Sequence, residues 1–159
     1  MALLMGYDVG SSSIKATLMD AETGQILASA TSPDKELDIM AAQAGWAEQH
    51  PATWWEHVKR ATEQIKSKAQ FDPGDVKAIG ISYQMHGLVV VDKKQEVLRP
   101  SIIWCDSRAV EIGRQAAKKI GPERCLKSLF NLPGNFTASK LKAFQKRTQD
   151  PWILKWEYE

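Results

Sequence analysis

The hydrophobic positions in the first part of the chain predict short buried strands joined by tight turns. Three mostly apolar runs of strand length lie there, at residues 3–9, 14–19 and 25–31. Between the second and third runs, residues 20–24 have the composition of a hairpin turn, with Gly24 free to adopt a positive φ. We therefore predict three consecutive strands in an antiparallel meander.

The next part of the chain predicts one long amphipathic helix. Pro51 suits the first helical turn, where its missing N–H costs nothing. The apolar side chains that follow are spaced by four, three and four residues, at Trp54, Val58, Ala61 and Ile65. Trp55 is expected to broaden this core-facing stripe, and the helix is expected to end near Ala69. The preceding residues 32–49 have no clear period and are predicted to be loop.

The second half of the pattern predicts further strands and then helices. Strands are expected at residues 76–82, 87–92 and 101–104, with a short strand pair around Lys93 and Lys94. Apolar side chains at helical spacing predict a helix over residues 107–119, and another helix is expected to begin near Thr137. This succession indicates an α/β fold with a mixed sheet and flanking helices.

Composition narrows the class of protein. The chain has 159 residues, of which 43% are hydrophobic, so it suits one ordinary globular domain. The net charge of +2 gives no reason to expect nucleic acid or an anionic membrane as partner, and no apolar run has the length of a membrane span. Cys105 and Cys125 are too few for a metal site or a disulfide framework. We expect a cytoplasmic protein.

The first candidate site is the segment Asp8–Lys15, DVGSSSIK, in which a strand ends in a carboxylate followed by glycine and hydroxyls. Gly10 allows an anion to approach the backbone closely, and the serines add donors. A carboxylate at a strand end can hold a metal-bound water beside a phosphate. Neither the Walker pattern nor the Rossmann fingerprint is present. The alternative is a plain β-turn rich in turn-forming residues.

Two further polar clusters follow predicted strands, where ligands tend to gather. In the first, Gln84 and His86 can hydrogen-bond a polyol and Gly87 lets a ligand reach the backbone, although a histidine at a strand end can equally be structural. In the second, Asp106 either caps the following helix, pairs with Arg108, or contributes to a site.

Tryptophans near the long helix offer stacking surfaces for a sugar. Trp46 lies in the predicted loop and is therefore the better candidate, whereas Trp54 and Trp55 are expected in the core.

In this order and spacing, the motifs resemble the N-terminal part of the FGGY family of carbohydrate kinases, and within it they are most similar to the xylulokinases. The resemblance covers residues 3–145 and is carried by DVGSSSIK from Asp8, GWAEQHPATWW from Gly45, GISYQMHG from Gly80, VLRPSIIWCDSR from Val97 and NLPGNFTASKL from Asn131. Residues 148–159 follow the family only loosely. A divergent helix, an artificial end of the chain or a shifted reading frame would each account for this tail.

The family fold implied by the resemblance is that of the actin-like ATPases, with two ribonuclease H-like domains. Residues 1–159 are then expected to be part of the N-terminal domain, which holds the phosphate loop and binds the sugar. The nucleotide-binding C-terminal domain and the general base are expected outside this chain, so the fragment alone is expected to be inactive.

The activity implied by the resemblance is transfer of the γ-phosphate of ATP, with Mg²⁺, to a sugar hydroxyl. The Met-His-Gly form of the third motif favours D-xylulose, which would give D-xylulose 5-phosphate, over glycerol. Another ketose or polyol, or a sugar- or phosphate-binding module without turnover, stays open. A homodimer of the full-length protein is left open as well.

The same resemblance assigns roles to individual residues. Asp8 is expected beside the transferring phosphate and its Mg²⁺, which it would hold through water. The nucleotide phosphates are expected at the turn and the residue that follows it, Gly10, Ser11, Ser12, Ser13 and Lys15. The sugar is expected at Met85, His86, Gly87, Asp106, Arg108 and Trp46.

Overall fold

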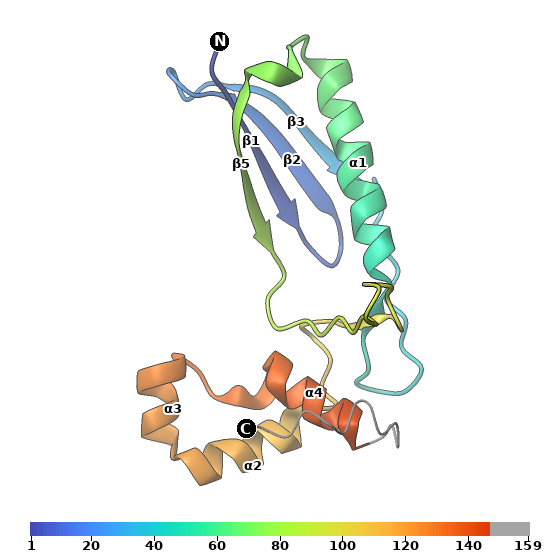
Figure 1. Cartoon of the computed structure of the whole chain (residues 1–159), viewed down its shortest axis with the longest axis vertical. Helices are drawn as coiled ribbons and strands as arrows, with labels where there is room; N and C mark the ends of the chain where they lie inside the picture. The colour runs from blue at the N-terminus through green and yellow to red at the C-terminus, as the bar shows by residue number, and fades with distance from the viewer. Residues whose placement is uncertain (147–159) are drawn as a thin grey trace. The chain divides into compact units, whose positions relative to one another are not determined.

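The computed structural model describes residues 1–146, and the loosely similar tail at 148–159 lies outside the described residues. The described chain divides into two compact units (Figure 1). The first unit comprises residues 1–39 and 49–85, and the second comprises residues 40–48 and 86–146. The division falls inside the GISYQMHG motif, between Met85 and His86.

The first unit is built on a four-stranded sheet with the strand order β3-β2-β1-β5. Its strands are β1 (Leu3–Val9), β2 (Ile14–Asp20), β3 (Ile26–Ser32) and β5 (Val76–Tyr83). The β1–β2 and β2–β3 pairs are antiparallel and the β1–β5 pair is parallel. These contacts confirm the predicted meander, the strand near residues 76–82 and the mixed sheet.

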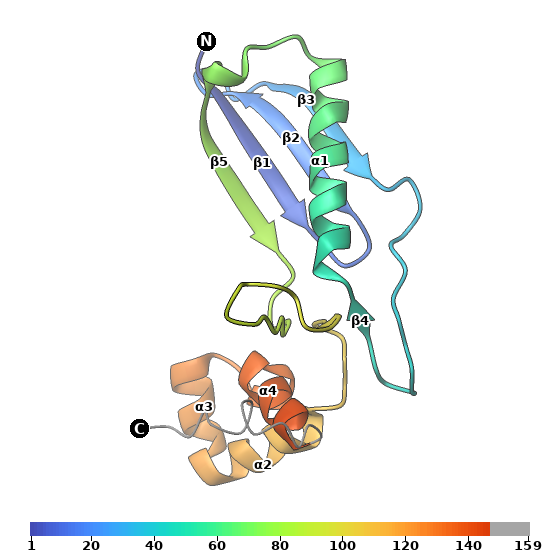
Figure 2. The ribbon, with the colours of Figure 1, turned by 45° about the vertical axis from the view of Figure 1, so that its right-hand side comes forward.

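One long helix, α1 (Pro51–Lys68), covers one face of this sheet (Figure 2). Its first turn contains the expected proline, and its Ala61 and Ile65 are completely buried in the core that the helix forms with the sheet. The placement of Trp55 in the core is wrong, because this side chain is 64% exposed. Trp54 is half-buried instead, and its indole N–H donates to the Gln49 side chain.

The edge strand β5 is the most exposed strand of the sheet. Seven of its eight residues are exposed. Ile79 and Ile81 pair in register with Met5 and Tyr7 of β1. Met5 and Tyr7 pack against α1, so Ile79 and Ile81 lie on the same face of the sheet, at its edge. An apolar groove of about 750 Å³ runs between α1 and this edge.

The second unit has little sheet and is mostly helical. A two-residue strand, β6 (Ser101–Ile102), pairs with β4 (Glu48–Gln49). The helices are α2 (Val110–Ile120), α3 (Pro122–Leu129) and α4 (Thr137–Gln145). Two 3₁₀ turns, η1 (Pro73–Asp75) in the first unit and η2 (Pro133–Asn135) in the second, complete the elements of residues 1–146. The expected start of a helix near Thr137 is confirmed.

Several boundaries in the second unit differ from the predictions. The apolar run 87–92 is not a strand, because it forms only isolated bridges, one to Ile102 and one that closes a turn around Lys93 and Lys94. Of the strand predicted at 101–104, only the two residues of β6 form a strand. Strand β4 was not predicted and lies in the segment that was expected to be loop. Helix α3 was not predicted. It forms because Gly121 ends α2 and Pro122 begins a new helix directly after it.

The helical part of the second unit packs through a close backbone approach. A Cβ atom added to Gly113 on α2 would overlap the carbonyl group of Pro133 in η2. Only glycine permits this contact. Within residues 1–146, no helix has both the length and the apolar character needed to cross a bilayer.

Candidate functional site

The predicted phosphate segment forms the tight connection between β1 and β2 in the first unit. The Gly10 N–H donates to the Ser13 carbonyl oxygen at 3.1 Å, and a Cβ at Gly10 would approach that oxygen to 3.0 Å. The carbonyl groups of Ser11 and Ser12 accept hydrogen bonds from Gln49 and Leu37, respectively, so the turn is anchored to the rest of the unit. Phosphate binding by Gly10, Ser11, Ser12 and Ser13 stays a prediction.

The two charged residues of this segment face each other across the β1–β2 pair. Lys15 Nζ lies 3.2 Å from Asp8 Oδ2, and both side chains are about half-exposed. The Asp8 carboxylate is therefore accessible to an incoming cation, and the Lys15 ammonium group to an incoming anion. Such an exposed pair contributes little to stability.

Among these residues, the Asp8 carboxylate is the group that could bind a metal ion. Residues 1–146 contain no group of three or more His, Cys, Asp or Glu side chains that could hold a metal ion. Mg²⁺ bound together with a nucleotide commonly takes only one or two protein carboxylates, the remaining ligands being phosphate oxygens and waters. The accessible Asp8 carboxylate meets this smaller requirement.

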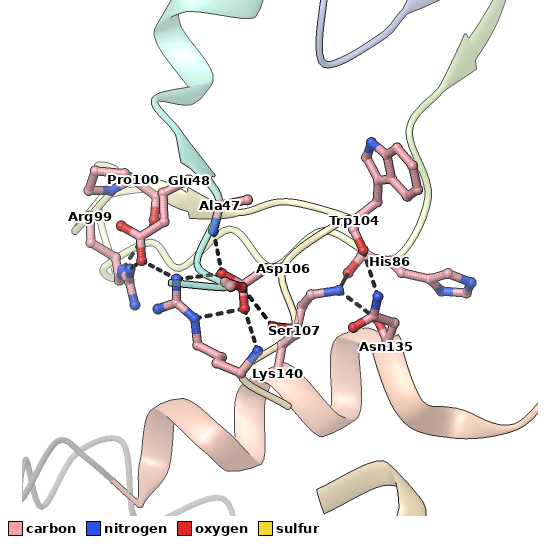
Figure 3. Close-up of polar contacts among 12 residues, drawn as sticks. Ala47, Glu48, His86, Arg99, Pro100, Trp104, Asp106, Ser107, Asn135 and Lys140 are labelled. Atoms are coloured by element: carbon pink, nitrogen blue, oxygen red, sulfur yellow. Dashed lines mark hydrogen bonds and ion pairs between the residues drawn. The ribbon is translucent and has the colours of Figure 1, made fainter. Parts of the chain in front are cut away.

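In the second unit, Asp106 and Arg108 belong to a cluster of buried and partly buried charges (Figure 3). Asp106 is completely buried and its carboxylate accepts hydrogen bonds from the Ala47 N–H at 2.6 Å and from Arg108 Nη2 at 2.7 Å. Glu48 binds Arg108 at 2.6 Å and also pairs with Arg99. We refer to Glu48, Arg99, Asp106 and Arg108 as the acidic–arginine cluster.

The charge state of Asp106 follows from these contacts. Burial raises the pKa of this carboxyl group, but hydrogen bonds from Arg108 and from the Ala47 backbone outweigh burial, and the net pKa lies below its ordinary value. Asp106 is thus a carboxylate whose role in the structure is to hold Arg108. The capping alternative is wrong, because helix α2 has Ala109 as N-cap and no side-chain cap hydrogen bond. The alternative of local pairing is confirmed.

Trp46 lies against this cluster. The guanidinium carbon of Arg108 is 3.8 Å from the centre of the Trp46 ring, a cation–π contact. One face of the indole is therefore occupied by the protein. Contacts of Trp46, Asp106 and Arg108 with a sugar stay predictions.

The Met-His-Gly segment presents its side chains where β5 has ended. Met85 is 63% exposed. His86 has a φ of 63°, and its ring stacks on Phe136 with centroids 4.6 Å apart. In the part of the chain that the structure describes, no group hydrogen-bonds to the imidazole nitrogens of His86. Gly87 accepts a hydrogen bond from the Thr137 hydroxyl at 3.2 Å. The predicted ligand-binding role of these residues stays a prediction.

Gln84 shows an unusual polar environment for a side chain at the end of a strand. Both side-chain amide atoms are buried, and neither has a hydrogen-bond partner among residues 1–146. Buried amide groups almost always have partners, so an unsatisfied one calls for a specific explanation. A ligand hydroxyl or a water would satisfy it, as the sequence suggested for this residue.

Lys140 is the main residue near the candidate site that sequence reasoning missed. It is completely buried, and its ammonium group donates to the carbonyl oxygens of His86 at 2.9 Å and Asn135 at 2.6 Å (Figure 3). Burial lowers its pKa. A signal was available, because Lys140 occupies the same helical stripe as Phe136 and Ala143, where a core residue is expected.

Comparison with known proteins places this geometry in a family. The profile of the FGGY family of carbohydrate kinases, N-terminal domain, matches residues 3–151. The xylulose kinase of Escherichia coli (strain K12) is 33% identical over 144 residues, which are 91% of this chain and 28% of that protein. The xylulose kinase of Klebsiella pneumoniae is 34% identical, with the same coverage of both chains.

Solved structures agree with the sequence relatives. A xyloylose kinase from Brucella ovis superposes with a TM-score of 0.76 at 33% identity, over 91% of this chain and 29% of that chain. A gluconate kinase from Lactobacillus acidophilus has a TM-score of 0.78 at 24% identity, over 96% of this chain and 30% of that one, and shows the fold alone. The chain spans less than a third of the length of these relatives. It belongs to the FGGY family of carbohydrate kinases.

Proposed function

We propose that the chain is the sugar-binding N-terminal part of an ATP-dependent sugar kinase whose substrate is D-xylulose and whose product is D-xylulose 5-phosphate. Family membership supports the reaction class, and the relatives named as xylulose kinases support the sugar. We place the protein in the cytoplasm, which supplies the ATP that this reaction requires. The observation that carries the proposal is His86, whose ring is ordered by stacking while its nitrogens have no partner in residues 1–146.

Recognition of the sugar is assigned to the second unit and to Met85 before it. A neutral imidazole offers one donor and one acceptor, which suits a sugar hydroxyl. Gly87 lacks a side chain, so a sugar can contact the backbone beside the ring. The exposed thioether of Met85 supplies an apolar surface for the carbon skeleton.

Recognition of the nucleotide phosphates is assigned to the first unit. Phosphoryl transfer depends mainly on positioning and charge stabilisation. Lys15 supplies a positive charge, and the serine hydroxyls supply donors. Mg²⁺, when bound with the nucleotide, would neutralise phosphate charge, and the half-exposed Asp8 carboxylate is the group that would hold it. We assign no general base to this chain.

The decisive experiment is a chimaera in which residues of this chain replace the matched 144-residue part of the Escherichia coli xylulose kinase. We expect ADP release that depends on D-xylulose, measured in a coupled assay beside other ketoses, gluconate and glycerol. His86→Ala should raise KM about tenfold, which corresponds to about one lost hydrogen bond to substrate. Asp8→Ala should lower kcat by about a hundredfold, a typical effect of removing one charge-stabilising group.

A matched control is Glu123→Ala, which removes an exposed carboxylate from α3 and should change neither constant. Preference for another sugar would change the substrate assignment within the same reaction class. Sugar binding without ADP release would favour a binding module. If both active-site variants behaved like the wild type, the assignment of the site would be wrong.

A further inference from the structure

Three contacts from one end of helix α4 converge on the dipeptide His86–Gly87. The Phe136 ring stacks on the imidazole with an interplanar angle of 16°, the Thr137 hydroxyl donates to the Gly87 carbonyl oxygen, and the Lys140 ammonium group donates to the His86 carbonyl oxygen. Lys140 also binds the Asn135 carbonyl oxygen, which ties the dipeptide to the chain just before α4 (Figure 3). The motif NLPGNFTASKL thus supplies every one of these contacts.

The backbone at His86 needs such support. Its φ of 63° lies in the left-handed region, which residues other than glycine adopt only at a cost in free energy. A residue stays there when its surroundings over-determine its conformation, and such residues cluster at ligand sites. Gly87, directly after it, could absorb a rotation of the intervening peptide, because glycine tolerates a wide range of backbone angles.

Lys140 is suited to prevent that rotation. The side chain is fully buried, and its ammonium group lies 2.9 Å from the carbonyl oxygen of the peptide that joins His86 to Gly87. If this part-buried carbonyl group lost its donor, it would be left unsatisfied, and the peptide would turn toward another partner by changing ψ of His86 and φ of Gly87. Because this turn changes ψ of His86, the left-handed φ of the residue would relax as well, and that relaxation would move the imidazole off the Phe136 ring.

We propose that Lys140 is a positioning residue that fixes the His86 backbone, and thereby the imidazole ring, in the orientation that binds the sugar. Lys140 itself touches no substrate and acts through His86. The inference deepens the proposed function and rests on it, because it assumes that His86 contacts the sugar. It predicts a loss of sugar affinity rather than of the phosphoryl-transfer step.

The structural part of the proposal is testable by NMR on the complete 159-residue chain, without any ligand. Lys140→Met keeps an unbranched apolar side chain but removes the ammonium group. We expect changed three-bond couplings that report φ of Gly87 and of His86, and loss of the cross-relaxation between the His86 and Phe136 rings. Lys142→Met is the matched control, because it removes the same charge from an exposed position on α4 and should leave both signals unchanged.

Thr137→Val provides a second variant should Lys140→Met fail to fold. Thr137 is exposed, and valine keeps its shape while removing the hydrogen bond to Gly87. We expect a smaller change of the same His86 signals. Wild-type couplings in a folded Lys140→Met chain, or in Thr137→Val if the first variant does not fold, would overturn the proposal.

The functional part uses the chimaera described above. Lys140→Met should raise KM for D-xylulose about tenfold with little change in kcat, and Lys142→Met should change neither. In a double-mutant cycle, Lys140→Met should add little to the effect of His86→Ala, because both changes remove the same contact. Additive effects, or an unchanged KM, would overturn the positioning role. An inactive wild-type chimaera would instead overturn the proposed function, while the NMR measurement would still decide whether Lys140 orders His86.

Discussion

The two units of the chain use opposite means to order the residues assigned to the site. In the first unit, Asp8 and Lys15 lie on neighbouring strands above a core of completely buried apolar side chains such as Leu3 and Leu18. In the second, His86 lies on irregular chain, and the completely buried side chains nearby include charged ones. Regular elements are ordered by the sheet ladder, whereas an irregular segment needs side-chain hydrogen bonds to hold its backbone.

The largest expected effect is a loss of stability of the second unit when Asp106 is replaced. Asp106→Ala leaves Arg108, only 5% exposed, with Glu48 as its remaining carboxylate partner. Loss of one partner of a buried ion pair costs about 3–5 kcal/mol, and the remaining pair places the expected loss at the lower end. Residue-resolved urea unfolding followed by NMR should show the loss in the second unit, with the first unit unchanged.

The control for this substitution is an ion pair in the same unit that lies at the surface. Glu111→Ala breaks the contact between Glu111 and Arg114, whose side chains are 61% and 64% exposed. Such pairs contribute about 0–1 kcal/mol. An equal loss in both variants would show that burial of the acidic–arginine cluster does not stabilise the second unit.

A smaller effect is expected at two glycines, one in each unit. Gly113→Ala forces a methyl group against the Pro133 carbonyl group, a backbone contact that cannot move aside. We expect a loss of about 1–3 kcal/mol, the usual range for overpacking. Gly80→Ala on β5 meets no atom within 4 Å and should stabilise the first unit by about 0.5–1 kcal/mol. Thermal unfolding of both variants checks the opposite signs, and destabilisation by Gly80→Ala would contradict them.

The first unit could be predicted from the sequence almost completely, because its order comes from hydrophobic periodicity. Strands β1 and β2 form at the predicted apolar runs 3–9 and 14–19, and α1 begins at the expected Pro51. The misplaced residue there was Trp55, which lies about 100° around the helix from the stripe that begins at Trp54 and whose side chain is 64% exposed.

The second unit could be predicted less well, because side-chain hydrogen bonds leave little periodic signal. The run 87–92 is as apolar as a strand, yet Val89 and Val91 are exposed and the run forms isolated bridges only. Family resemblance pointed to Asp106 and His86, but it did not indicate that Lys140 links α4 to the His86 backbone. That contact joins residues 54 positions apart and becomes visible only in three dimensions.

The smallest expected effect is a different pH dependence of the two units. His57 is buried on α1 with its ring 2.8 Å from the Ser32 hydroxyl, and burial, assisted by Arg60, lowers its pKa below 6.5. As pH falls below 6.5, the unfolded chain therefore binds a proton before the folded chain does. The stability of the first unit should decrease until the pH has passed the folded pKa, and then level off.

The Asp106 pKa, by contrast, is lowered from 3.8, so its contribution is present above that pH and lost only as pH falls through the lower folded value. Between about pH 6.5 and 4, His57 should thus lower the stability of the first unit, while Asp106 leaves the stability of the second unit unchanged. Urea unfolding resolved by unit at several pH values measures this difference. His57→Asn should remove the decrease in stability of the first unit as pH falls. His50→Asn, at the exposed N-cap of α1, is the control and should retain this decrease, since asparagine also caps helices well. A slope that survives His57→Asn would assign the acid sensitivity to another group in the first unit.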